Sequence, residues 1–388
     1  MNDSWSGPLL AVLVGGPPHS GKSVLIYSLS QALRGRGVAH YALRACPDGE
    51  GDWSNEAPPE LVREIRIKGQ WTQEWVERIA ADIDRRHLPL LVDVGGRPTP
   101  EQAALLGRCT HAILLTPDHE TRAWWRELVD RHGVPVVAEL SSDLRGENRL
   151  TASDPIVRGT LAGLERRSTA SGPAFDALVD RLAALFPDRE ALRSRHLAAA
   201  PAEIELVVDL DRLARTLGVP LQGEQPIWQP EHLPALVDYL PAATPLAVYG
   251  RGVTWVIATL ARLAHPAPFF SFDTRLGWVQ ARPLRLDEAP GGSQVRYHVD
   301  RSAGVFRLTI DFVDHYIDYD ELEQMTAPPV PDGVGVVLSG KLPLWLFASL
   351  AISYQAAPWL ALYQPTSGGS VVIASSTGQP PLGTLWPD

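Results

Sequence analysis

Apolar runs alternate with amphipathic segments through the first third of the chain. The apolar runs that read as strands cover residues 9–14, 39–43, 88–94, 111–116 and 134–140. Apolar positions at helical spacing follow the first run, over residues 24–33, and return over residues 173–185. Short strands separated by helices are typical of a parallel sheet with helices on both faces. The pattern therefore predicts an α/β fold with a mostly parallel sheet.

The second half of the chain repeats a pattern at a period of about ninety residues. Residues 246–255 read LAVYGRGVTW and residues 336–345 read VVLSGKLPLW. Each copy thus has an apolar strand, a glycine beside a basic residue, and a Trp that opens a helix. Two further apolar strands follow in each copy, which predicts two α/β modules of strand, helix, strand and strand. Two such copies could pack as the halves of a homodimer do and share a central cleft.

Composition narrows the class of protein. The chain has 388 residues with a formal net charge of -10, and no apolar run is long enough to span a bilayer. Its two cysteines, Cys46 and Cys109, cannot build a disulfide framework, which fits a reducing compartment. The acidic balance argues against a long nucleic acid as partner but leaves room for a basic pocket around a small anion. We therefore expect a cytoplasmic protein without membrane contact.

The clearest chemical signal lies between the first apolar run and the helix that follows it. The segment reads Gly16-Pro17-Pro18-His19-Ser20-Gly21-Lys22-Ser23, which has the spacing Gly, four residues, Gly-Lys-Ser. In such a loop the backbone N–H groups and the helix N-terminus surround a phosphate, Lys22 reaches the β- and γ-phosphate oxygens, and the Ser23 hydroxyl ligates Mg²⁺. The segment predicts a P-loop NTPase domain.

A carboxylate follows at the end of the third apolar run. Asp93 stands where a carboxylate holds Mg²⁺ through water or orients the attacking water. With Gly95 and Gly96 it also forms an Asp-x-x-Gly segment, in which a glycine N–H can meet the γ-phosphate and report its loss. A plain cap of the strand end is the alternative. We expect Lys22, Ser23 and Asp93 to carry ATP hydrolysis, with the last two as metal ligands.

The nucleotide base is inferred from a missing motif. A guanine-specific site usually carries an Asn-Lys-x-Asp segment, and none of the lysines of this chain, Lys22, Lys68 and Lys341, lies in one. Adenine is therefore the preferred base, so that ATP and Mg²⁺ are the expected cofactors.

An acidic loop follows the second apolar run, and loops at the carboxyl ends of parallel strands are where ligands bind in such folds. Asp48, Glu50 and Asp52 lie in this loop, and Arg97 follows the Asp-x-x-Gly segment. Together they could form the acceptor site of a small-molecule or nucleotide kinase, with the C-terminal half as a scaffold. A solvated acidic loop and a surface arginine remain the alternative.

Two stretches of the repeat carry a family resemblance. Residues 337–345 (VLSGKLPLW) in the second copy and 272–277 (FDTRLG) in the first match Ser-Gly-x-x-Pro-x-Trp and most of Asp-Pro-Arg-Leu-Gly. They resemble the CRISPR-associated ring nucleases, which bind and degrade cyclic tetra-adenylate and are in some cases joined to a P-loop ATPase. The resemblance implies three parts: a P-loop ATPase domain with a helical connector at 1–200, and ring-nuclease-like modules at 201–290 and 291–388.

The departures from that family concern the titratable groups. In the family, two His residues and the Asp of Asp-Pro-Arg-Leu-Gly surround the active site. The first copy offers His265, Asp273 and Arg275, with Arg282 near the last position. The second copy has only uncharged side chains in the matching places: Gln355, Gln364, Thr366 and Ser376. These groups cannot exchange protons near neutral pH, so the second copy is expected to bind a ligand or serve as structure.

The first copy keeps His265 and Asp273 as a candidate remnant of the nuclease. The segment that joins them is about one residue shorter than its counterpart in the second copy. Because side chains alternate along a strand, this difference predicts a change in the face that the side chains occupy.

Glycine turns before a helix are present in both copies, at Gly250-Arg251-Gly252 and Ser339-Gly340-Lys341. Their N–H groups, Arg251 and Lys341, together with Arg275, could receive the phosphates of a small cyclic nucleotide. Plain helix starts would give the same pattern. We expect an ATP-hydrolysing homo-oligomer that binds a cyclic oligoadenylate. An active ring nuclease regulated by ATP, and the kinase described above, remain the alternatives.

Overall fold

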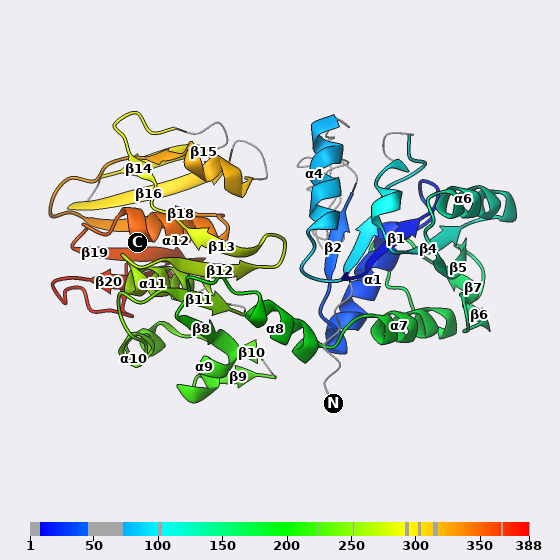
Figure 1. Ribbon diagram of the computed structural model, residues 1–388, viewed down its shortest axis with the longest axis horizontal. Coiled ribbons are helices and arrows are strands. Elements are labelled where there is room, and N and C mark those ends of the chain that lie inside the picture. Colours follow the sequence, from blue (N-terminus) through cyan, green and yellow to red (C-terminus); the bar gives the residue numbers. More distant parts are fainter. Residues whose placement is uncertain are drawn as a thin grey trace. The chain divides into compact units, whose positions relative to one another are not determined.

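A computed structural model describes residues 8–45, 73–99, 103–223, 225–250, 252–291, 295–301, 304–312, 317–365 and 368–387. The chain forms two compact units (Figure 1). Unit 1 takes the chain up to Ala198 together with Thr274–Gly277, and unit 2 takes Ala199–Asp273 and Trp278–Asp388. The expected division into three domains stays a prediction.

Unit 1 is built on a seven-stranded sheet of order β2-β3-β1-β4-β5-β7-β6. Neighbouring strands run parallel throughout this sheet, except that the edge strand β6 is antiparallel to β7. The strands are β1 (Ala11–Gly15), β2 (Tyr41–Arg44), β3 (Leu90–Asp93), β4 (His111–Thr116), β5 (Val136–Asp143), β6 (Arg149–Ala152) and β7 (Val157–Ala162). The predicted α/β class with a mostly parallel sheet is confirmed for this unit.

Two hydrophobic clusters flank the sheet of unit 1, because side chains alternate along each strand. In β1, Val12 and Val14 join one cluster, whereas Ala11 and Leu13 join the other. Helices α1 and α7 supply the first cluster, and α4 and α6 supply the second. The helices are α1 (Lys22–Gly35), α4 (Gln73–Asp84), α6 (His119–Arg131), α7 (Pro173–Leu185) and α8 (Arg189–Ala198), with the 3-10 helix η1 (Leu106–Arg108).

Unit 2 contains two larger sheets, of order β13-β12-β11-β8 and β15-β16-β18-β19-β20-β21, and two small ones, β9 with β10 and β14 with β17. The strands are β8 (Leu206–Asp209), β9 (Leu221–Gln222), β10 (Gln225–Pro226), β11 (Leu246–Tyr249), β12 (Phe269–Asp273), β13 (Gly277–Ala281), β14 (Arg285–Leu286), β15 (Val295–Asp300), β16 (Val305–Phe312), β17 (Thr326–Ala327), β18 (Gly335–Gly340), β19 (Trp359–Gln364), β20 (Gly369–Ser375) and β21 (Leu385–Trp386). The helices are α9 (Leu210–Thr216), α10 (Leu233–Tyr239), α11 (Thr254–Ala264) and α12 (Leu344–Ser353), with the 3-10 helices η2 (Pro230–His232) and η4 (Tyr319–Glu323).

The predicted repeat of strand, helix, strand and strand is present twice in unit 2, as β11-α11-β12-β13 and β18-α12-β19-β20. In both copies the first strand lies between two parallel neighbours, β8 and β12 in one case and β16 and β19 in the other. Helices α11 and α12 pack against each other, and each also contacts a strand of the other copy. The two copies therefore share one core.

The strand registers correct one prediction. Leu246 lies beside Phe269 in the first copy, and Val336 lies beside Leu360 in the second. The additional residue of the second copy is thus accommodated before its strand begins. Asp273 and Gln364 consequently reach the same position in the two sheets, and the predicted change of face is wrong.

Candidate functional site

The Gly16–Ser23 loop connects β1 to α1 and requires glycine at both ends. Gly21 has a φ of 87°, and a Cβ there would lie 2.6 Å from the Cβ of Leu164. A Cβ on Gly16 would lie 2.1 Å from the carbonyl oxygen of Leu115, at the end of the neighbouring strand β4. A larger residue at either place would meet a steric clash, and at Gly21 also a backbone conformation that L residues rarely adopt. The loop is therefore packed tightly against its sheet.

Lys22 is the first residue of α1 and turns back over the loop. Its Nζ donates hydrogen bonds to the carbonyl oxygens of Gly16, at 2.9 Å, and Pro17, at 2.7 Å. The residue is 7% exposed. The ammonium group is thus held within the loop by the backbone, where a phosphate oxygen could take the place of one of these acceptors.

Ser23 and Asp93 are brought together by the parallel pairing of β1 with β3, in which Val14 lies beside Asp93. The Ser23 hydroxyl donates to one Asp93 carboxylate oxygen at 3.2 Å, and the Gly95 N–H donates to the other at 3.1 Å. Asp93 is 6% exposed. The same carboxylate thus caps the turn after β3 and contacts the second residue of α1, so the two roles considered for it are compatible.

This oxygen pair fits Mg²⁺, which is usually held by one or two protein oxygens together with phosphate oxygens and water. Within the described ranges, no group of three or more His, Cys, Asp or Glu side chains is placed to hold a metal ion. The geometry therefore suits an ion that arrives with a phosphate, and it does not suit an ion held by protein side chains alone.

Two buried hydroxyl groups near the loop lack hydrogen-bond partners in the part of the chain that the structure describes. They are Oγ of Ser20, which is 4% exposed, and Oγ1 of Thr116, which is fully buried at the end of β4. A buried hydroxyl without a partner is costly, and in native proteins it asks for an explanation such as a ligand or an ordered water. Nothing in the local sequence pattern marked Thr116.

The segment after Asp93 is in contact with the loop on one side and with α6 on the other. A Cβ on Gly96 would lie 2.8 Å from Cγ of Pro18, so the two backbones approach closely. The Arg97 guanidinium lies over the ring of Trp124 in α6, 5.1 Å from the ring centroid. The sequence singled out Arg97 but gave no sign of Trp124. The acidic residues Asp48, Glu50 and Asp52 lie outside the described residues.

The two glycine turns of unit 2 lie where β11 and β18 end and α11 and α12 follow. Gly250 has a φ of 111° and Gly340 a φ of 146°. A Cβ on Gly340 would lie 2.4 Å from the carbonyl oxygen of Ile310. Lys341 is exposed, and Arg251 lies outside the described residues. The turns place glycine at equivalent positions in the two copies, as the repeat predicts.

His265 and Asp273 lie at opposite ends of β12. His265 follows the last residue of α11, before the strand begins, whereas Asp273 is the last residue of the strand. A strand of five residues spans roughly 16 Å. Arg275 follows Asp273 in the connection to β13, and Arg282 comes after the far end of β13. The structure thus does not bring His265 and Asp273 into one acid-base pair within a single chain.

Three aromatic side chains that the sequence analysis did not single out gather beside the Gly250 turn. The ring centroids of Tyr249 and Phe272 are 5.0 Å apart, and those of Phe272 and Trp278 are 5.4 Å apart. Tyr249 is the last residue of β11, Phe272 the second-last of β12 and Trp278 the second of β13, so only the pairing of the strands reveals the cluster. At the matching positions the second copy has Ser339 in place of Tyr249, but it keeps an aromatic ring, Tyr363, in place of Phe272.

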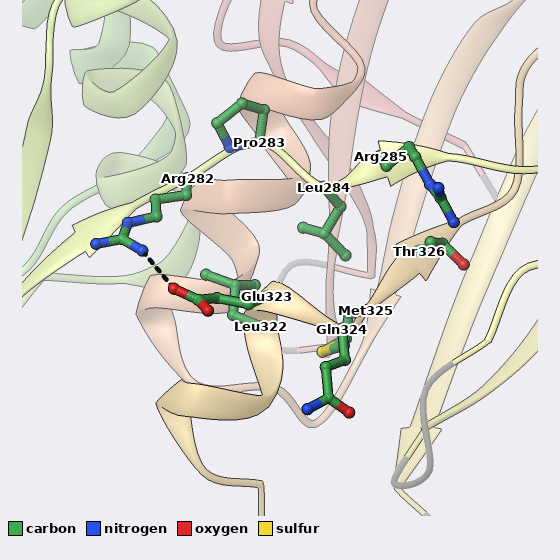
Figure 2. A pocket seen from close by; sticks show the side chains of 9 residues that line it. All are labelled: Arg282, Pro283, Leu284, Arg285, Leu322, Glu323, Gln324, Met325 and Thr326. Carbon is green, nitrogen blue, oxygen red and sulfur yellow. Dashed lines mark hydrogen bonds and ion pairs between the residues drawn. The ribbon is translucent and has the colours of Figure 1, made fainter.

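A cavity of about 410 Å³ lies at the end of β13 that is remote from Asp273 (Figure 2). Leu284, Leu322 and Met325 are buried in its wall. Arg282 stands at one end and forms an ion pair with Glu323 at 3.1 Å. The positive charge of Arg282 there already has a carboxylate partner, and the lining residues include neither glycine turn.

Comparison with known families gives a match in the C-terminal part of the chain. Residues 310–385 match the family model described as CRISPR-associated protein (Cas_csx3). The match covers about a fifth of the chain and lies within unit 2, from β16 to β21. It supports a CRISPR-associated protein. In the described residues, no helix is both long enough and apolar enough to cross a membrane.

Proposed function

We propose that unit 1 is a P-loop NTPase domain that binds ATP with Mg²⁺ and hydrolyses it. The observation that carries the proposal is the contact between Ser23 and Asp93 directly beneath a loop that holds Lys22 inward. The unpartnered Ser20 hydroxyl supports it further, because the hydroxyl lies within the same loop. Adenine is preferred because the sequence lacks the Asn-Lys-x-Asp segment of guanine sites.

In this proposal, each group of the loop acts by binding or orientation. The backbone N–H groups of Gly16 and of His19 to Ser23 bind the β- and γ-phosphates together with the Lys22 ammonium, which exchanges the loop carbonyls for phosphate oxygens. Pro17 and Pro18 have no N–H and contribute none. Ser23 and Asp93 hold the metal ion, and Asp93 also orients the attacking water. Bound Mg²⁺ supplies positive charge to the β- and γ-phosphate oxygens. The N–H of Gly96, the glycine of the Asp-x-x-Gly segment, would meet the γ-phosphate and report its loss.

We propose for unit 2 that its two glycine turns bind a cyclic oligoadenylate, with cyclic tetra-adenylate as the first candidate. The CRISPR-associated match and the resemblance of the repeat to ring nucleases support this ligand class. The ligand residues would be Gly250, Arg251 and Gly252 in one copy and Ser339, Gly340 and Lys341 in the other, with Arg275 from the connection between β12 and β13. The protein would then be a cytoplasmic, homo-oligomeric accessory of CRISPR defence.

Binding is preferred over cleavage because His265 and Asp273 are separated by the length of β12. A general acid or base must come within hydrogen-bond reach of the reacting group, and two groups that far apart do not act on one phosphodiester. An active ring nuclease is therefore the alternative function, which the test below would detect as cleavage of the ligand.

The test is incubation of the whole protein with labelled cyclic tetra-adenylate, with and without Mg²⁺ and ATP. Retention of intact ligand supports the proposal, and cleavage supports the ring nuclease. If the ligand is neither retained nor cleaved, cyclic tetra-adenylate is not a ligand of unit 2. ATP hydrolysis is measured in the same samples as release of phosphate. Light scattering of the same preparations gives the number of chains in the assembly.

A further inference from the structure

Arg97 directly follows Gly96, the residue that packs against Pro18 of the phosphate-binding loop. Gly96 leaves no room for a Cβ against Pro18, so the backbone that carries Arg97 is fixed beside the loop. Asp93 anchors the start of this segment through the Gly95 N–H. The side chain of Arg97 is itself exposed, and in the described ranges it forms no ion pair with a carboxylate.

The guanidinium of Arg97 rests on a rigid platform. Trp124 lies beneath it at 5.1 Å and stacks edge-on against Trp125, with ring centroids 5.3 Å apart. Trp125 is fully buried, and a Cβ on Gly15 would lie 2.8 Å from its ring. The platform is thus packed against the last residue of β1, directly before the loop begins.

The contact with Trp124 is weak compared with what a phosphate offers. An exposed cation–π contact is worth less than a charge-assisted hydrogen bond from a guanidinium to phosphate. An arginine near the transferred phosphoryl group is a recurring means of stabilising charge in phosphoryl transfer. We infer that Arg97 leaves Trp124 and donates hydrogen bonds to the γ-phosphate in the transition state. This inference rests on the proposed hydrolysis of ATP at this loop.

The reaction balances without proton transfer by Arg97. Water attacks the γ-phosphorus, the bond from that phosphorus to the β,γ-bridging oxygen breaks, and the electron pair leaves with ADP. The proton of the attacking water passes to the phosphate product or to solvent. Arg97 stays protonated throughout, because an arginine guanidinium does not lose its proton in proteins. Its part is to stabilise the negative charge on the γ-phosphoryl and bridging oxygens.

The experiment compares the affinity for ADP with the affinity for ADP and aluminium fluoride, both with Mg²⁺, in the full-length protein. Aluminium fluoride with ADP imitates the transferred phosphoryl group. Arg97→Ala is expected to weaken binding of the aluminium fluoride complex about 10- to 100-fold and to leave binding of ADP unchanged. Arg97→Lys should fall between the two. Arg85→Ala is the control, because Arg85 is exposed and lies before the amino end of β3.

A second readout follows Trp124 itself. Its emission, taken as the difference between the wild type and Trp124→Phe, should change when the aluminium fluoride complex binds. The change should be missing in Arg97→Ala. Equal loss of affinity for ADP and for the aluminium fluoride complex, or no loss for either, would overturn the inference while leaving ATP binding in place. Absence of nucleotide binding by the wild type would instead overturn the proposed function and the inference with it.

Discussion

The loop of unit 1 and the turns of unit 2 have the same outline of strand, glycine and helix, but their surroundings differ. In unit 1, Lys22 is 7% exposed and bonded to the loop, and a carboxylate on the next strand meets the helix start at Ser23. In the second copy of unit 2, Lys341 is exposed, and α12 begins with Leu344 and Trp345. A glycine turn supplies N–H donors, whereas the neighbouring strand decides which chemistry can follow.

The two copies within unit 2 also differ in the side chains beside their turns. The strand beside β11 ends at Asp273, and the strand beside β18 ends at Gln364, at the same register. The first copy has a carboxylate at that place, and the second has an uncharged amide. Of the two rings Tyr249 and Phe272, the second copy keeps one, because Tyr363 stands at the position of Phe272 and Ser339 at that of Tyr249. The shared core preserves the framework, while the polar groups have diverged.

The largest expected effect comes from exchanging the two lysines for alanine in turn. Lys22→Ala should reduce ATP turnover by more than 100-fold, because it removes a charge held at the phosphate site. Lys341→Ala is the matched control, since it removes a lysine from a similar turn with no buried partner. Release of phosphate from ATP measures both. Equal activity in Lys22→Ala and wild type would contradict the assignment of the loop.

A substitution that preserves shape tests the carboxylate. Asp93→Asn keeps an oxygen that can accept hydrogen bonds from Ser23 or Gly95, but it removes the negative charge that a metal ion needs. We expect turnover to fall about 10- to 100-fold and the Mg²⁺ concentration needed for half-maximal turnover to rise. Circular dichroism should show an unchanged fold. An unaltered Mg²⁺ requirement would leave Asp93 as a cap of the strand end alone.

A substitution in a turn of unit 2 should affect binding of the cyclic nucleotide and not binding of ATP. Lys341→Ala is expected to weaken binding of cyclic tetra-adenylate about 10-fold, because a charged hydrogen bond to phosphate is lost. Binding of ATP should stay at the wild-type level. Equilibrium dialysis with both labelled ligands separates the two effects. A loss of ATP affinity with intact cyclic nucleotide binding would reverse the roles given to the two units.

The smallest effect concerns stability and compares two glycines of unit 1. Gly21→Ala should lower the free energy of unfolding by about 3 kcal/mol, since it adds a contact with Leu164 to a strained backbone. Gly163→Ala, at a φ of 64° and with open space around it, should cost about 1 kcal/mol. Urea denaturation measures both. Similar costs at the two positions would mean that the loop rearranges to accept a side chain.

Local patterns were sufficient to predict the strand, loop and helix around Lys22, because each of these elements is defined within a few consecutive residues. They also placed Asp93 at a strand end. The pairing of β3 with β1, which brings Asp93 to Ser23, follows from the strand order and is not written in either segment. The same holds for Arg97 and Trp124. They meet because β3, which precedes Arg97, and β4, which precedes α6 and Trp124, are the two neighbours of β1 in the sheet.

Strands β6 and β7 were missed, since neither lies in one of the apolar runs that predicted strands. Gly159 shows why a local pattern fails there: its Cβ would lie 2.2 Å from the carbonyl oxygen of Arg149. The close approach of the two strands selects glycine, and it depends on a partner ten residues away. The register of the repeat was misjudged for a related reason, because the connection before β19 absorbs the additional residue.

The most direct measurement is a titration of the wild-type protein with a fluorescent ATP analogue, first with Mg²⁺ and then with the metal removed by EDTA. Saturable binding that weakens at least 10-fold without Mg²⁺, and that unlabelled ATP displaces, is the predicted result. Absence of saturable binding, or binding of equal strength with and without Mg²⁺, would contradict the account of Lys22, Ser23 and Asp93 as a nucleotide site.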